Sequence, residues 1–153
     1  MKISIFFPWL ITNVVILLLL LSIISAHFYP YQHILDENER IFWRTTFYIL
    51  TIFILPLTNL LRYIFLRLNQ TMPLLENTNV ESVVKLRYTL TVSISMLLML
   101  IVGSFGATIF YFGDGVNSLH ILTGVALLGV FLYRPKLIEY QQIIHALTEN
   151  DDD

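Results

Sequence analysis

The sequence predicts an all-α membrane protein, built as a four-transmembrane-helix bundle with both termini in the cytoplasm. Three observations lead to this fold class. Hydrophobic residues make up 56% of the chain and charged residues only 13%, whereas about a quarter of the residues in soluble domains are charged; the mean hydropathy is +0.72. Four apolar runs stand out along the chain. The basic residues gather on one side of these runs.

The four apolar runs cover residues 5–26, 42–61, 90–112 and 119–133. A helix needs about 20 apolar residues to cross a bilayer, so the fourth run is short for a span. The first run could also be a secretory signal, because Lys2 precedes it and the small residues of SIISA end it. Its apolar region exceeds the roughly 7 to 15 residues of a signal core, so we interpret it as an uncleaved span.

Lysine and arginine residues indicate the orientation of the spans, because they favour the cytoplasmic side of short loops. Seven of the nine basic residues fall on one side: Lys2, Arg62, Arg67, Lys85, Arg87, Arg134 and Lys136. The connections on the other side carry Asp36, Glu37, Glu39 and Asp114 beside Arg40 and Arg44. This distribution places both termini in the cytoplasm, and together with the short loops it favours the inner membrane of a bacterium.

The chain divides into a four-helix transmembrane domain, residues 1–136, and a short cytoplasmic segment, residues 137–153. In that segment Leu137, Tyr140, Ile144 and Leu147 recur at helical spacing. Such spacing predicts an amphipathic helix lying along the membrane surface. The acidic tail DDD ends the chain.

Small residues recur along the third run and share one narrow helical stripe, made of Thr91, Ser95, Gly103 and Ala107 and widened by Gly106. Gly124 and Gly129 give the fourth run a small surface of its own. Helices in lipid pack closely where small side chains let their backbones approach. We interpret these residues as the contact between the third and fourth runs, with a homodimer face as the alternative. Met99 and Leu100 are expected on the opposite face.

Several function classes are disfavoured. No Asp, Glu, Lys or Arg lies deep inside an apolar run, which argues against proton-coupled transport. No nucleophile with a base and an orienting group can be assembled, and the absence of cysteine removes thiol chemistry. The basic residues form no patch for nucleic acid. Asn13 and Asn59 lie inside the first and second runs, where we expect them to form hydrogen bonds between helices.

His27 and His120 are the candidate cofactor ligands. The first run ends on the outer side at His27, and the fourth run begins there just before His120. Opposite chain directions therefore bring both imidazoles to one leaflet. Neutral imidazole binds haem iron, copper and zinc, and Gly124, one turn from His120, would leave room for haem b.

Neighbouring outer residues could extend this site. His33 and Asp114 lie in the outer loops and could enlarge it into a metal cluster. Arg44, about one turn into the second run, could pair with Asp114 or with a haem propionate.

One histidine pair across four helices resembles membrane b-type cytochromes. That family typically carries a pair near each leaflet, and no second pair exists here, because His145 lies beyond the fourth run. The resemblance covers two residues and a helix count.

Two functional classes rank above the others. We expect a non-enzymatic accessory, regulatory or immunity-type membrane protein, whose partners are the lipid bilayer and either another membrane protein or a second copy of itself. The alternative is a small b-type haem or metal-binding redox protein that uses His27 and His120 at the outer face. A small-solute channel comes third, since the spans carry no buried charge.

Overall fold

The computed structural model describes residues 5–28, 33–72 and 80–149. These residues form five helices and no strand: α1 (Phe6–Phe28), α2 (Glu37–Thr71), α3 (Val80–Tyr111), α4 (Val116–Leu132) and α5 (Leu137–Glu149). The all-α prediction is therefore confirmed. The acidic tail and most of the loop between α2 and α3 lie outside the described residues.

The helix boundaries follow local chemistry. Asp36 precedes α2, and Glu37 and Glu39 occupy its first turn, where negative charge favours the helix dipole. Pro135 lies in the break between α4 and α5, since proline disfavours helical backbone at the residue before it. Gly113 turns the chain from α3 to α4 with a φ of 87°, a conformation that glycine adopts readily.

Three helices, α1, α2 and α3, are long and apolar enough to cross a membrane. The fourth helix, α4, has 17 residues and reaches this length only together with α5, from which it is bent by 44°. The chain therefore has three to four candidate spans, and its apolar helices suit a membrane-integral protein.

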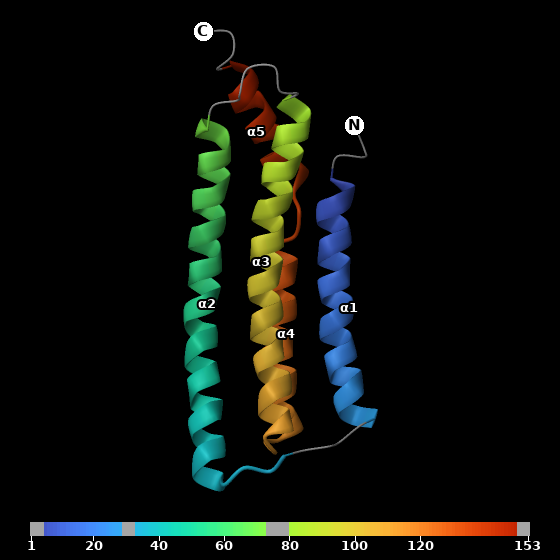
Figure 1. The fold of residues 1–153 in the computed structure, drawn as a ribbon, viewed down its shortest axis with the longest axis vertical. Helices are drawn as coiled ribbons and strands as arrows, with labels where there is room; N and C mark the ends of the chain where they lie inside the picture. Colours follow the sequence, from blue (N-terminus) through green and yellow to red (C-terminus); the bar gives the residue numbers. More distant parts are fainter. Residues whose placement is uncertain (1–4, 29–32, 73–79, 150–153) are drawn as a thin grey trace.

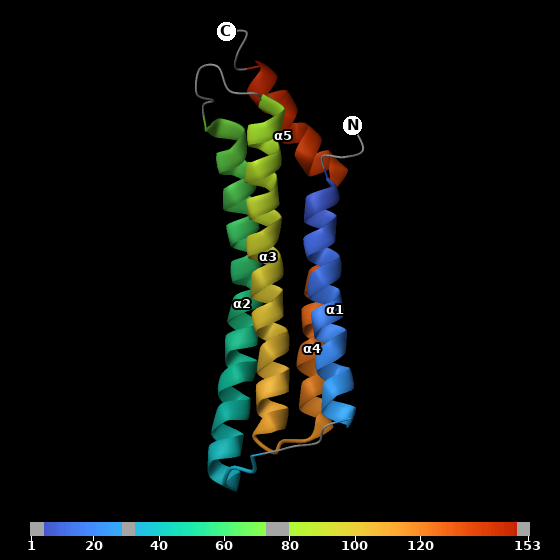
Figure 2. The ribbon, with the colours of Figure 1, turned by 45° about the vertical axis from the view of Figure 1, so that its right-hand side comes forward.

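The helices surround α3 (Figures 1 and 2). This helix contacts each of the other four, while α1 and α2 do not touch one another within the described residues. α4 runs antiparallel beside α3, and α1 packs on both of them. α5 lies across α2 and α3 at one end of the molecule. We call this end the α5 end, and the end with the Gly113–Gly115 turn the turn end.

The core extends from the middle of the molecule to the α5 end. In the middle, Val92, Met96 and Val102 of α3 pack with Leu19 of α1 and Ala126 of α4. At the α5 end the same cluster continues through Val84, Tyr88, Tyr140, Ile143 and Leu147. The apolar side of α5 therefore packs on the bundle, whereas the sequence predicted that it would face the membrane surface.

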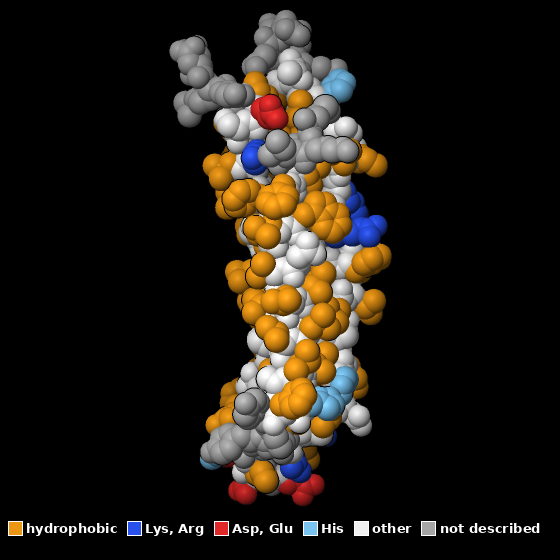
Figure 3. Space-filling model, turned by 90° about the vertical axis from the view of Figure 1, so that its right-hand side faces the viewer, with side chains coloured by type: hydrophobic (Ala, Val, Ile, Leu, Met, Phe, Trp, Pro, Cys, Tyr) orange, Lys and Arg blue, Asp and Glu red, His pale blue; other side chains and the backbone are white. Residues whose placement is uncertain are grey.

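Exposed apolar side chains cover the middle of the molecule, and charged side chains lie nearer its two ends (Figure 3). On α2, Ile52 and Phe53 are 67% and 66% exposed, and on α1 Leu17 is 59% exposed. Surfaces of this kind are normally in contact with lipid or with another apolar protein surface.

Candidate functional site

His27 and His120 lie together at the turn end. Their ring centroids are 5.8 Å apart, and the rings are edge to face with an interplanar angle of 78°. Each ring also bonds to its own helix: Nδ1 of His27 lies 3.0 Å from the carbonyl oxygen of Ile23, and Nδ1 of His120 lies 2.8 Å from that of Val116. A carbonyl only accepts, so each Nδ1 donates its proton, and in the neutral form of each ring Nε2 then keeps its lone pair.

This tautomer is the one that metal-binding histidines commonly adopt, with Nδ1–H donated to a carbonyl and Nε2 directed to the metal. Both side chains are exposed, so an ion could reach them from outside the bundle. A Cβ atom built on Gly124, one turn from His120, meets no atom within 4 Å. The donor set and the open space beside it suit a transition-metal ion or an axially ligated haem iron.

The other residues expected at this site have different contacts. The ring of His33 stacks on Tyr111 with 6.4 Å between centroids, and no group of three His, Asp or Glu side chains suited to a metal occurs in the described ranges. The structure thus brings the two histidines together and does not add His33 or Asp114 to them.

Arg44 and Asp114 fasten α2 to the turn between α3 and α4. The guanidinium of Arg44 lies 3.3 Å from a carboxylate oxygen of Asp114, whose other oxygen accepts a 2.6 Å hydrogen bond from Ser118. Arg40 donates to the carbonyl of Gly113 at 3.2 Å. Of the two partners expected for Arg44, Asp114 and a haem propionate, the structure shows Asp114. Arg44 belongs to α2, which does not contact α1, the helix that carries His27.

The small residues of α3 face three different helices. A Cβ at Gly103 would collide with Leu19 of α1, and one at Gly106 would lie 3.1 Å from Leu122 of α4. Thr91 accepts a hydrogen bond from Asn69 of α2 at 3.0 Å.

The remaining members of the small-residue set differ in burial. Ser95 is buried, whereas Ala107 is half-buried. The open position of Gly124 gives it no close helix contact within this chain, and Gly129 packs against Met99 in its place. Met99 contacts Gly129 of α4, the helix whose Ala126 also lies beside Gly103, and residues four apart share a helix face, so its expected place on the opposite face was wrong.

Asn13 and Asn59 lie on the surface of α1 and α2, and both are exposed. Within the part of the chain that the structure describes, neither amide bonds to another helix. The expected hydrogen bonds between helices are therefore not formed inside this molecule.

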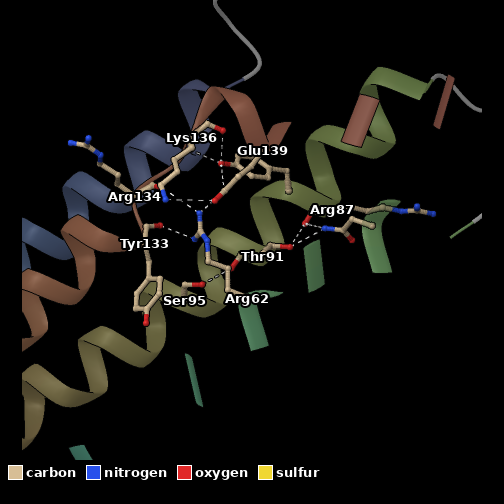
Figure 4. Close-up of polar contacts among 10 residues, drawn as sticks. Arg62, Arg87, Thr91, Ser95, Tyr133, Arg134, Lys136 and Glu139 are labelled. Atoms are coloured by element: carbon tan, nitrogen blue, oxygen red, sulfur yellow. Dashed lines mark hydrogen bonds and ion pairs between the residues drawn. The ribbon is translucent and has the colours of Figure 1, made fainter. Parts of the chain in front are cut away.

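The most connected polar cluster lies at the α5 end and was not anticipated from the sequence (Figure 4). Arg62 of α2 is only 6% exposed, and its guanidinium donates to Glu139 of α5 at 2.6 Å. It also donates to the carbonyls of Tyr133 and Arg134 at 2.7 and 3.3 Å. These carbonyls lie at the end of α4, where no further helical turn supplies a donor.

Tyr88 of α3 completes this cluster. Its hydroxyl lies 3.2 Å from the Glu139 carboxylate and accepts a 2.7 Å hydrogen bond from the backbone N–H of Lys136. The ammonium of Lys136 is 4.0 Å from Glu139 and is largely exposed. Helices α2, α3 and α5 and the end of α4 are thus joined through one carboxylate and one guanidinium.

The position of Arg62 in the sequence is the only signal that pointed toward this cluster. It follows 17 uncharged residues and precedes the apolar residues of YIFL, which sets it apart from a loop residue. Its acceptor, Glu139, lies 77 residues away, so no local pattern could pair them.

Comparison with protein-family models, curated proteins and solved structures finds no match to this chain.

Proposed function

We propose that this chain is a four-span protein of a bacterial inner membrane that acts without catalysis, by contacting another membrane protein through its helices. In this proposal α4 is the fourth span. Its 17 residues extend about 26 Å at 1.5 Å per residue, slightly less than the hydrocarbon thickness of about 30 Å. An accessory, regulatory or immunity-type role is the functional class that fits such a protein.

The distribution of charge supports cytoplasmic termini. Arg62, Arg134 and Lys136 lie at the α5 end, while Asp36, Glu37, Glu39 and Asp114 lie at the turn end. Between Arg44 and Arg62 the second helix has no charged residue. The positive-inside tendency then assigns the α5 end to the cytoplasm.

Asn13 is the observation that carries the proposed helix contact. It lies seven residues after Phe6, about 10 Å along α1, and its amide faces outward beside exposed Leu10 and Leu17. A polar side chain directed into hydrocarbon is costly unless another helix satisfies it. A partner helix that docks on this face of α1 would supply the missing hydrogen bond.

Photocrosslinking in cells tests this contact. A photoreactive residue replaces Leu17, on the same face of α1, with either Asn13 or Asn13→Leu in the chain. We expect a discrete protein adduct with Asn13, weakened about fivefold by Asn13→Leu, since one hydrogen bond between helices in lipid contributes about 1 kcal/mol.

The mass of the adduct distinguishes a second copy of this chain from another protein. The matched control places the photoreactive residue at Phe53 on α2, where Asn13→Leu should change nothing. If position 17 yields only lipid adducts in every chain, the helix contact is rejected.

The second candidate function is metal or haem binding by His27 and His120. It is favoured by the 5.8 Å separation of the rings and by the two Nε2 lone pairs that their bonds to backbone carbonyls leave available. When bound, such a metal would supply electron transfer at the outer face. The chain itself would fix both ligands on the rigid ends of two packed helices.

A further inference from the structure

A cavity of about 490 Å³ opens between α2 and the corner where α4 ends and α5 begins. Its walls are formed by Asn59, Arg62, Tyr63, Leu66, Leu132, Tyr133, Lys136 and Glu139. Figure 4 shows Arg62, Lys136 and Glu139 drawn together at this corner. The charged cluster described above is therefore one wall of an accessible cavity.

Hydrogen-bond donors predominate among the polar groups of this cavity. Lys136 offers an ammonium that is 53% exposed, Tyr63 a hydroxyl on a side chain that is 67% exposed, and Asn59 an exposed amide. Arg62 adds a guanidinium with five N–H donors, three of which donate to Tyr133, Arg134 and Glu139. Such a set suits an anion with several acceptor oxygens.

The charged side chains that line the cavity have a net positive charge, which favours an anion. Arg62 and Lys136 contribute two positive charges, and Glu139 contributes the one negative charge of the cavity wall. The carboxylate of Glu139 is already occupied, because it accepts from Arg62 and Tyr88 and lies beside Lys136. The guanidinium of Arg134 is not part of this wall, because it lies over the ring of Phe131, 4.5 Å from its centroid.

The position of the cavity indicates a lipid. It lies where the apolar surface of α4 ends: Leu132 lines the cavity and Phe131 precedes it, and both are 63% exposed. On α2, Leu57 and Leu60 precede Arg62 in the direction of the middle of the molecule, and both are exposed. These exposed apolar side chains give acyl chains a surface to lie on while the headgroup occupies the cavity.

We propose that this cavity binds the phosphate of an anionic phospholipid headgroup, with Lys136 and Asn59 as its accessible donors and Arg62 as the buried cation behind them. Basic pockets between helices on the cytoplasmic side are a general mode of headgroup recognition. The inference depends on the proposed topology only for the identity of the leaflet.

Native mass spectrometry of the full chain in detergent tests the site, with phosphatidylglycerol, phosphatidylcholine or inorganic phosphate added separately. We expect phosphatidylglycerol adducts on the unmodified chain that phosphatidylcholine does not give. Lys136→Gln should weaken them about fivefold, the effect of removing one lysine from an anionic surface. Asn59→Leu should weaken them too, and Arg67→Gln is the matched control, since it removes one exposed positive charge of α2 outside the cavity.

Each result decides the proposal. Equal lipid adducts on the unmodified chain and on both Lys136→Gln and Asn59→Leu would overturn it, as would an equal loss in Arg67→Gln, which would indicate general charge attraction. Inorganic phosphate that displaces phosphatidylglycerol and raises the melting temperature equally would assign the cavity to a free anion instead. A C-terminus found outside the cell would move the site to the other leaflet without abolishing lipid binding, so the two proposals fail separately.

Discussion

At the scale of single residues, the ion pair between Arg62 and Glu139 is the contact whose loss should cost most stability. Removing one partner leaves the other charge buried, a change that costs about 3 to 5 kcal/mol in proteins. Since Glu139 keeps some exposure to solvent, we expect Glu139→Gln to lower the free energy of unfolding in mixed micelles by about 3 kcal/mol.

A double substitution tests whether the two residues act together. Arg62→Met with Glu139→Leu should cost less than the sum of the single changes, because neither charge is then left alone. Arg67→Met, on the exposed side of the same helix, is the control and should change stability little. Additive costs would show that the two side chains contribute independently.

The two histidines at the turn end support a second prediction at this scale. If the pair is a metal site, His27→Ala and His120→Ala should each abolish the bound metal or haem, and combining them should cause no further loss. Visible absorption and elemental analysis of protein expressed with added haem, copper and zinc measure this. His145→Ala, at the α5 end, is the control. Protein that is isolated colourless and metal-free with both histidines intact rejects the site.

Arg44 separates the two interpretations of this end of the molecule. Its guanidinium contacts Asp114, so Arg44→Ala is expected to lower stability and to leave any metal on the histidine pair in place. Weaker haem retention in this variant would instead indicate a propionate partner. His120→Gln should be nearly neutral if the ring is only interfacial, since an amide keeps hydrogen-bonding capacity.

Residue-scale features differ in how well the sequence predicts them. His27 and His120 could be placed together, because two apolar runs of opposite direction fix the end of the bundle at which each ring lies. The burial of Arg62 could not, because it depends on a carboxylate that arrives from α5. Asn13 and Asn59 show a related limit: a period of 3.6 residues tells which residues share a face but not which helix, if any, covers that face.

At the scale of helices, the same substitution at Gly103 and at Gly124 should have opposite results, so Gly124 serves as the control for Gly103. We expect Gly103→Leu to destabilise the fold in detergent, because the new side chain collides with Leu19 and forces α1 away from α3. Removing such close approach is costly in lipid, where little hydrophobic drive remains between helices. Gly124→Leu should be tolerated, since its Cβ would meet no atom within 4 Å.

Melting temperatures of the two variants measure the difference. If both changes are equally harmless, α1 does not depend on the small residue of α3. If Gly124→Leu instead lowers the mass of the particle by dissociating an oligomer, this glycine faces a second copy of the chain.

The apolar runs predicted where the helices are but not how far they extend. α2 and α3 continue well past the second and third runs at the α5 end. Their extra turns include Arg67, Asn69 and Val84. Because polar and apolar residues are mixed there, the mean hydropathy of these turns does not mark them as part of a span. These turns are helical because one side packs beneath α5, where Val84 is fully buried, and such packing stabilises helices more than propensity does.

At the scale of the whole molecule, α3 is the helix that contacts each of the other four within the described residues. α1 and α2 lie on separate sides of it and leave most of their apolar surface uncovered. A closed four-helix bundle would bury a stripe of each helix against two neighbours, but α2 touches α4 only slightly. This open arrangement gives a partner or lipid access to both flanking helices, which is what the two binding proposals require.

The last prediction concerns the orientation of this arrangement in the membrane. Reporter fusions at residue 75 and at the C-terminus should both report a cytoplasmic location, and fusions near residues 36 and 115 an external one. The reason is the concentration of Lys and Arg at the α5 end, because residues that need not cross the membrane remain inside. The fusions test α4 most directly, since its 17 residues are close to the shortest length that spans hydrocarbon. If α4 enters and leaves on the same side, the fusions at 115 and at the C-terminus will agree with each other, and the four-span proposal is rejected. If they disagree as predicted, α4 crosses, and His120 lies with His27 at the outer face.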